Sequence, residues 1–161
     1  MPDDHHHLSF RLLQFTVPGM PHIDLGLPLV QVLEVGGLPL VTPLPFTPSF
    51  VTGVSQWRGQ LITVIDLAAL ICGQQSATNN SHPDTEDVRQ RYVIAQVVVE
   101  DRIELIAWPI LFQARAVVVP PRLEQASPLD GIASWLVFST LVMDHPLVLL
   151  DIDQVVTGFS G

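Results

Sequence analysis

The sequence predicts a mostly β protein built from one or two small β-barrels, with only short helices. Many short segments carry alternating or continuous apolar residues and are bounded by Gly, Pro and Asp, which is typical of strands. The long helical crossovers that a parallel sheet requires are missing. With 161 residues, of which 48% are hydrophobic, the chain can hold one ordinary domain or two small lobes that share a core.

The first part of the chain alternates strands with proline-rich pieces. A first strand is expected over residues 8–15, and it ends near the Val-Pro-Gly of residues 17–19. A second β region covers residues 25–35, and Pro28 within it indicates an edge strand or a break. Residues 36–48 contain too many prolines for a regular element, so we expect an ordered loop there.

The most informative stretch follows this loop. Residues 51–57 are expected to form a short strand, residues 58–59 an Arg-Gly turn, and residues 61–65 a second strand rich in β-branched side chains. Asp66 comes next and is expected to cap a short helix over residues 67–71. The pattern therefore predicts a tight hairpin that runs directly into a helical turn.

The second half of the chain begins with a polar segment, residues 73–91, which is the candidate flexible loop and the approximate boundary between two lobes. Asp151 or Asp153 is expected to start a short closing helix that runs through Val156. Strands are expected between these two segments and before the helix, over residues 92–100, 103–109, 111–119, 134–143 and 147–150.

The order of small-residue strand, Arg-Gly turn, β-branched strand, Asp-Leu and short helix resembles the signature of the CheW family of chemotaxis coupling proteins. Residues 25–35 resemble the second-strand segment of that family, and residues 43–45 resemble its apolar-proline element. The resemblance implies a CheW-like domain over residues 8–157, made of two SH3-like five-stranded β-barrel lobes packed side by side, after a flexible N-terminus at residues 1–7. One departure is Trp108-Pro109, where many family members carry Val-Asp.

The resemblance also implies a function. Family members are non-catalytic adaptors without a cofactor, and they couple a transmembrane, methyl-accepting chemoreceptor to a CheA-type histidine kinase in chemotaxis, twitching motility or phototaxis. Carried over by position, Arg58, Val32 and Glu34 fall where partner contacts are expected, and Trp57 is a candidate anchor beside Arg58. An apolar groove with one guanidinium at its rim can bind an amphipathic receptor helix.

Other readings stay open for several residues. Arg58 is equally a candidate for a structural role, in which it ties its turn to Asp66 or to a backbone carbonyl. Cys72 is expected to be buried packing, and Trp57 and Trp108 to be core or interface aromatics. The alternative function is a small β-barrel enzyme or ligand-binding module, which would require a polar pocket with convergent titratable groups. A detached regulatory domain of a larger kinase is a further alternative.

Charge and composition exclude several classes of partner and chemistry. The formal net charge is −9, so binding to nucleic acid or to an anionic membrane surface is not expected. The chain contains no Lys, which removes phosphate-binding loops and Schiff-base mechanisms. The three adjacent histidines at residues 5–7 lack the spacing and support of a metal site, so neither a metal nor a cofactor is expected.

The sequence also predicts where the protein acts. It has neither a signal-peptide pattern nor an uninterrupted apolar run of the roughly 18 residues that a membrane span needs. Its single cysteine, Cys72, cannot form an internal disulfide, which fits a reducing compartment. We therefore expect a cytoplasmic protein that does not insert into the membrane.

Overall fold

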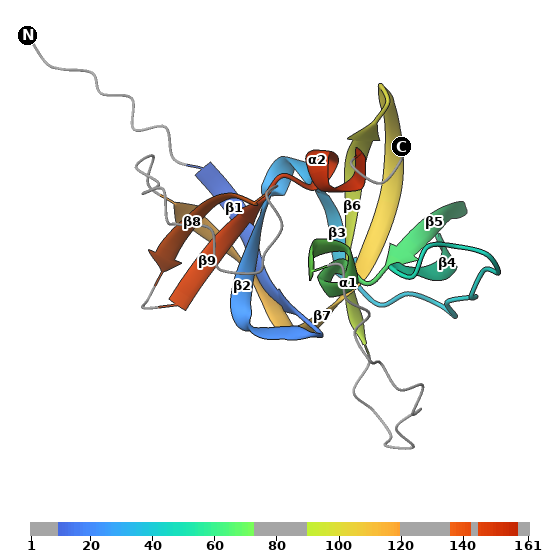
Figure 1. Ribbon diagram of the computed structural model, residues 1–161, viewed down its shortest axis with the longest axis horizontal. Coiled ribbons are helices and arrows are strands. Elements are labelled where there is room, and N and C mark those ends of the chain that lie inside the picture. The colour runs from blue at the N-terminus through green and yellow to red at the C-terminus, as the bar shows by residue number, and fades with distance from the viewer. Residues whose placement is uncertain (1–9, 73–89, 120–135, 143–144, 158–161) are drawn as a thin grey trace, which may run out of the picture.

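The computed structural model describes residues 10–72, 90–119, 136–142 and 145–157, and these form a mostly β fold (Figure 1). Three short helical segments accompany the strands: the 3-10 helix η1 Leu29–Gln31, and the helices α1 Leu67–Cys72 and α2 Ile152–Thr157. The described strands are β1 Phe10–Val17, β2 Met20–Pro28, β3 Val32–Gly36, β4 Val51–Trp57, β5 Gln60–Ile65, β6 Arg91–Val99, β7 Arg102–Val119, β8 Leu136–Val142 and β9 His145–Leu150.

The long strand β7 belongs to two sheets. Up to Ile110 it pairs with β6, and from Leu111 onward it pairs with β1. The second half of β7 continues through β1, β2 and β9 to β8, and we call these strands the first sheet. The first half lies between β6 and β5, which carry β3 and β4 on their outer sides, and we call these strands the second sheet. Each sheet thus contains five described strands, as the predicted fold requires.

The continuity of β7 corrects one expectation from the sequence. Two separate strands were expected, over residues 103–109 and 111–119. The structure keeps one strand, and the change of sheet falls at the expected break. Phe112, with φ of 58°, lies where the register against β1 shifts, so a β-bulge bends the strand there.

The pairing also shows where the chain passes between the lobes. The sequence placed the approximate boundary in residues 73–91, of which 73–89 lie outside the described residues, as does the N-terminus at residues 1–7. The strands on either side of that segment, β5 and β6, both pair with the first half of β7 and belong to the second sheet. The chain therefore passes between the two sheets at η1, which joins β2 to β3, and again within β7, and the strands that flank the polar segment belong to the same sheet.

The largest apolar cluster is shared by both sheets and both α-helices. All residues of α1 from Leu67 to Ile71 are buried, and all of them except Ala69 belong to this cluster. Trp108 of the second sheet is fully buried, and its ring centroid lies 5.7 Å from that of Phe15 in the first sheet. Smaller clusters belong to one sheet each, around Ile62 and Ile94 in the second sheet and around Leu12 and Leu147 in the first. The two lobes consequently share a core.

Several local expectations are confirmed. Strand β2 ends at Pro28, and η1 follows it, so the proline does break the second β region. The Asp66 carboxylate accepts a hydrogen bond of 3.0 Å from the Ala69 backbone N–H and so caps α1. The Asp151 carboxylate accepts one of 3.2 Å from the Gln154 N–H at the start of α2.

The loop between β3 and β4, residues 37–50, is fastened to β4. Thr42 and Val54 exchange two backbone hydrogen bonds of 2.8 and 2.9 Å. This contact depends on Gly53, because a Cβ at that position would collide with the carbonyl group of Thr42. Since β3 and β4 are the outer strands of the second sheet and no described ladder joins them, the loop helps to close this lobe.

We expect Gly53→Ala to destabilise the protein by about 2 kcal/mol, because the new methyl group forces Thr42 away and breaks both hydrogen bonds to Val54. Chemical denaturation followed by circular dichroism measures this loss. Gly37→Ala is the matched control, since a Cβ there meets no atom within 4 Å, and it should stay within about 0.5 kcal/mol of the wild type. Equal stability of the two variants would contradict the role of Gly53.

Candidate partner-binding site

The hairpin between β4 and β5 presents Arg58 at its tip. Arg58 and Gly59 have φ values of 48° and 81°, the pair of positive angles that defines a type I′ turn. Gly59 supplies this conformation without strain, and a Cβ there would meet no atom within 4 Å, so only the backbone angle requires glycine. The turn exposes 70% of the Arg58 side chain.

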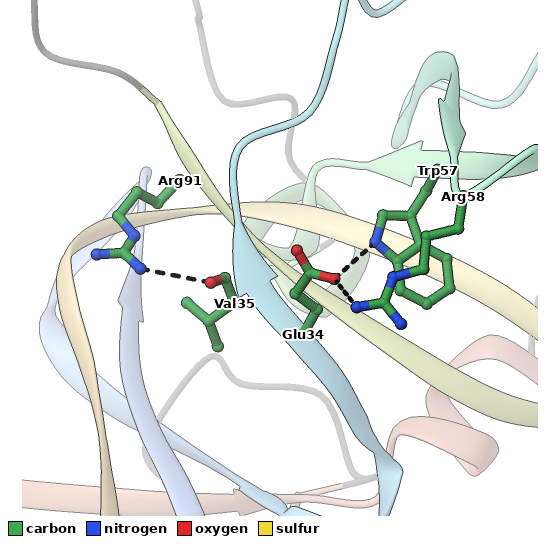
Figure 2. Close-up of polar contacts among 5 residues, drawn as sticks. All are labelled: Glu34, Val35, Trp57, Arg58 and Arg91. Carbon is green, nitrogen blue, oxygen red and sulfur yellow. Dashed lines mark hydrogen bonds and ion pairs between the residues drawn. The ribbon is translucent and has the colours of Figure 1, made fainter.

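One carboxylate oxygen of Glu34 accepts hydrogen bonds from both Trp57 and Arg58 (Figure 2). Glu34 Oε2 accepts a hydrogen bond of 3.0 Å from Trp57 Nε1 and one of 2.9 Å from Arg58 Nη2. The guanidinium carbon of Arg58 lies 4.8 Å from the centre of the Trp57 ring, which adds a cation–π contact. We call these three residues the Glu34 cluster.

The cluster joins the two outer strands of the second sheet. Glu34 lies in β3 opposite Ile94 of β6, and 35% of its side chain is exposed. Trp57 ends β4, and its ring packs, half-buried, on the apolar cluster around Ile62 and Ile94. A half-buried indole N–H bonded to a carboxylate is a stronger tie than an exposed ion pair, because water competes less for it.

The predicted site residues are brought together with one exception. Glu34, Trp57 and Arg58 are in direct contact, whereas the partly buried Val32 packs against the shared core. A register shift separates Val32 from Glu34 in β3. Val32 thus helps to pack β3, the strand that contains Glu34, against the core.

Two expectations about this region need correction. The structural alternative for Arg58 named Asp66 as a partner, but the Asp66 carboxylate caps α1 and Arg58 pairs with Glu34. Cys72 was expected to be buried and is exposed at the end of α1, with its sulfur 3.8 Å from that of Met20. Partial burial of the thiol, together with the nearby Asp66 carboxylate, raises the pKa of Cys72, so it stays protonated at neutral pH.

Sequence reasoning missed one residue beside the cluster. The Arg91 guanidinium donates a hydrogen bond of 3.4 Å to the backbone carbonyl of Val35, next to Glu34 (Figure 2). The only sequence signal is its position at the start of a strand, which does not identify the partner. Nearby, burial raises the pKa of Tyr92, so its hydroxyl stays neutral at physiological pH.

Two features are absent from the described part of the chain. No group of three or more His, Cys, Asp or Glu residues in it could hold a metal ion. No helix in the same ranges combines the length and apolar character needed to cross a bilayer.

Comparisons with known proteins identify a family and a similar fold. A family model described as the CheW-like domain matches residues 11–158. Protein FrzA of Myxococcus xanthus is 54% identical over 45 residues, a match that covers 28% of this chain and 28% of FrzA. The crystal structure of the scaffolding protein TtCheW from Thermoanaerobacter tengcongensis has a TM-score of 0.65 at 18% identity, covering 94% of this chain and 90% of TtCheW. The structural likeness confirms the predicted fold class.

Double-mutant cycles should rank the contacts of Glu34. We expect a coupling of about 1 kcal/mol between Glu34→Ala and Trp57→Phe, because phenylalanine keeps an aromatic ring but lacks the N–H donor. The coupling between Glu34→Ala and Arg58→Ala should be only about 0.2–0.5 kcal/mol, since Arg58 is largely exposed. The free energy of unfolding, measured by denaturant titration, gives both values.

A third cycle provides the control. Arg91 bonds the Val35 carbonyl and not the Glu34 carboxylate, so Arg91→Ala should show almost no coupling to Glu34→Ala. A coupling to Arg58 that exceeds the coupling to Trp57 would show that the ion pair, and not the indole hydrogen bond, holds the cluster together.

Proposed function

Because the chain belongs to the family of CheW-like domains, whose model matches residues 11–158, we propose that it is a non-catalytic chemotaxis adaptor. In this role it couples a methyl-accepting chemoreceptor to a CheA-type histidine kinase at the cytoplasmic side of the membrane. The Glu34 cluster is the site that binds the receptor. The protein acts by contact alone and needs no cofactor.

The observation that carries this proposal is the orientation of Arg58. Its guanidinium is held by Glu34 and stacked on Trp57, while most of the side chain faces solvent. A guanidinium carries five N–H donors in a rigid fork, so bonding one nitrogen to Glu34 leaves it able to donate to a carboxylate or carbonyl of a partner helix. Because the fork is held in place before binding, less conformational entropy is lost on association.

The other residues of the predicted site take supporting roles. Trp57 offers the apolar face of a large ring beside the charge, the combination that anchors many protein interfaces. Glu34 holds Trp57 and Arg58 in one arrangement, and Val32 seats β3 on the core. An amphipathic receptor helix would pack its apolar side on Trp57 and direct a carboxylate or carbonyl toward Arg58.

Arg58→Ala tests the receptor contact. We expect the variant to remain folded and to bind a purified receptor signalling fragment more weakly by about 1–3 kcal/mol, because a charge-assisted hydrogen bond is lost. Titration calorimetry measures the binding, and circular dichroism checks the fold. Arg102→Ala is the matched control, since Arg102 is also exposed and follows the turn of another hairpin.

The outcomes separate the two roles considered for Arg58. Loss of receptor binding in a folded Arg58→Ala protein, with Arg102→Ala unchanged, supports a direct contact. A collapse of thermal stability in Arg58→Ala would favour the structural role instead, and full binding by a folded variant would remove Arg58 from the receptor site.

Bridging makes a second prediction, about stoichiometry. In a reconstituted mixture of receptor, kinase and this protein, kinase output should rise and then fall as the adaptor is titrated into large excess. The fall follows because each receptor and each kinase becomes occupied by a different copy of the adaptor. Kinase activity measured across the titration tests this, and a rise to a lasting plateau would count against bridging.

A further inference from the structure

The loop between β3 and β4 lies at one edge of the molecule, beside β4 and β5 (Figure 1). It exposes several large apolar side chains. Phe46 is fully exposed, Leu40 is 85% exposed, and Leu44 is also open to solvent. No Asp, Glu, Lys, Arg or His occurs between Glu34 and Arg58, although the chain as a whole carries a net charge of −9. The loop is therefore an uncharged apolar projection on an acidic protein.

The loop is held in one conformation by its own hydrogen bonds. Beyond the two backbone bonds between Thr42 and Val54, the Ser55 hydroxyl lies 3.3 and 3.4 Å from the carbonyl oxygens of Pro39 and Leu40. The Thr47 hydroxyl donates to the Leu44 carbonyl at 3.1 Å. Four prolines, at positions 39, 43, 45 and 48, further restrict the backbone. A projection that is already ordered loses little entropy when it binds.

Phe46 lies in this loop with an unfavourable backbone conformation. Its φ of 60° lies in the left-handed region, which a bulky residue rarely adopts and which Asn or Gly tolerates better. Its ring is exposed, so no burial within the chain offsets the strain. Phe46 lies outside the strands, so no β-bulge explains its strain as one does at Phe112, and its strain and exposure together indicate a function outside the fold.

We propose that Phe46 is an anchor that inserts into an apolar, uncharged pocket on a partner protein. This inference rests on the proposed adaptor function, and the partner is the one that does not occupy the Glu34 cluster, namely the kinase. Thr42 pairs with Val54 and the chain enters β4 at Val51, so residues 43–50 connect Thr42 to the start of β4, whereas Arg58 follows the end of that strand. The loop and Arg58 can therefore be engaged by two partners at once.

Charge and shape favour this occupant over others. A second copy of the chain would bring two molecules of net charge −9 together, and an anionic membrane would repel the protein in the same way. A single rigid ring on a narrow loop suits a pocket that surrounds it, the usual setting of an interface hot spot.

The test compares Phe46→Asn with the wild type for binding to two purified probes, a CheA-type kinase and a receptor signalling fragment from the same organism. We expect kinase affinity to fall about tenfold or more and receptor affinity to stay unchanged. The melting temperature should be equal or higher, because Asn accepts a positive φ more readily than Phe. If Phe46 served only the fold, its replacement would not raise stability and at the same time weaken kinase binding.

Phe112→Asn is the matched control, since Phe112 is also an exposed phenylalanine with positive φ, at 58°. It should share the effect on stability and keep full kinase affinity. Phe46→Gly serves as a second variant, because glycine also fits the left-handed region.

Each outcome decides between the proposals. Wild-type protein that binds neither probe overturns the adaptor function and the anchor with it. Wild-type binding with unchanged kinase affinity in Phe46→Asn overturns the anchor alone, as does a loss of receptor binding in place of kinase binding. Unfolding of both Phe46 variants would show that the ring supports the fold, and it would also overturn the anchor.

Discussion

Strand β7 is the constraint on which the rest of the structure depends. Its first half completes the second sheet and its second half completes the first sheet, with a bulge at Phe112 next to the crossing. Because β7 belongs to both lobes, the apolar faces of the two sheets pack together in one cluster. This cluster contains Trp108 and Phe15. Neither lobe can separate without exposing that cluster, and hydrophobic burial is the main force that stabilises folds.

The same strand fixes the geometry of the Glu34 cluster. On one side β7 pairs with β6, and β6 pairs with β3, which contains Glu34. On the other side β7 pairs with β5, and β5 pairs with β4, which ends at Trp57. The cluster thus joins the two ends of a five-stranded arrangement that no described ladder closes. The hydrogen bond from the half-buried Trp57 contributes more to this closure than the exposed Arg58, which leaves the guanidinium for a partner.

The features that could be predicted from the sequence are those that a few neighbouring residues determine. The Arg-Gly hairpin, the Asp66 cap and the break at Pro28 follow from backbone angles and local hydrogen bonds. The bond between Glu34 and Trp57 spans 23 positions and depends on how β3 and β4 are placed by β6, β7 and β5, which no local pattern records. The continuity of β7 was likewise missed: two strands were expected on either side of Ile110, but one strand runs from Arg102 to Val119 and pairs with partners distant in the sequence.

The two proposed contact regions differ in the physics of binding, and β4 connects them. The Glu34 cluster offers a fixed charge at one end of this strand, so its contact gains direction from hydrogen bonds and weakens as salt screens the charge. The loop that contains Phe46 offers exposed apolar surface, so its proposed contact gains affinity from burial of area and not from charge. Since β4 is paired along its length with β5, the separation and relative orientation of the two regions are set by the fold. An adaptor built in this way would couple its partners by holding them at a fixed geometry, and no conformational change in the adaptor is needed to explain the coupling.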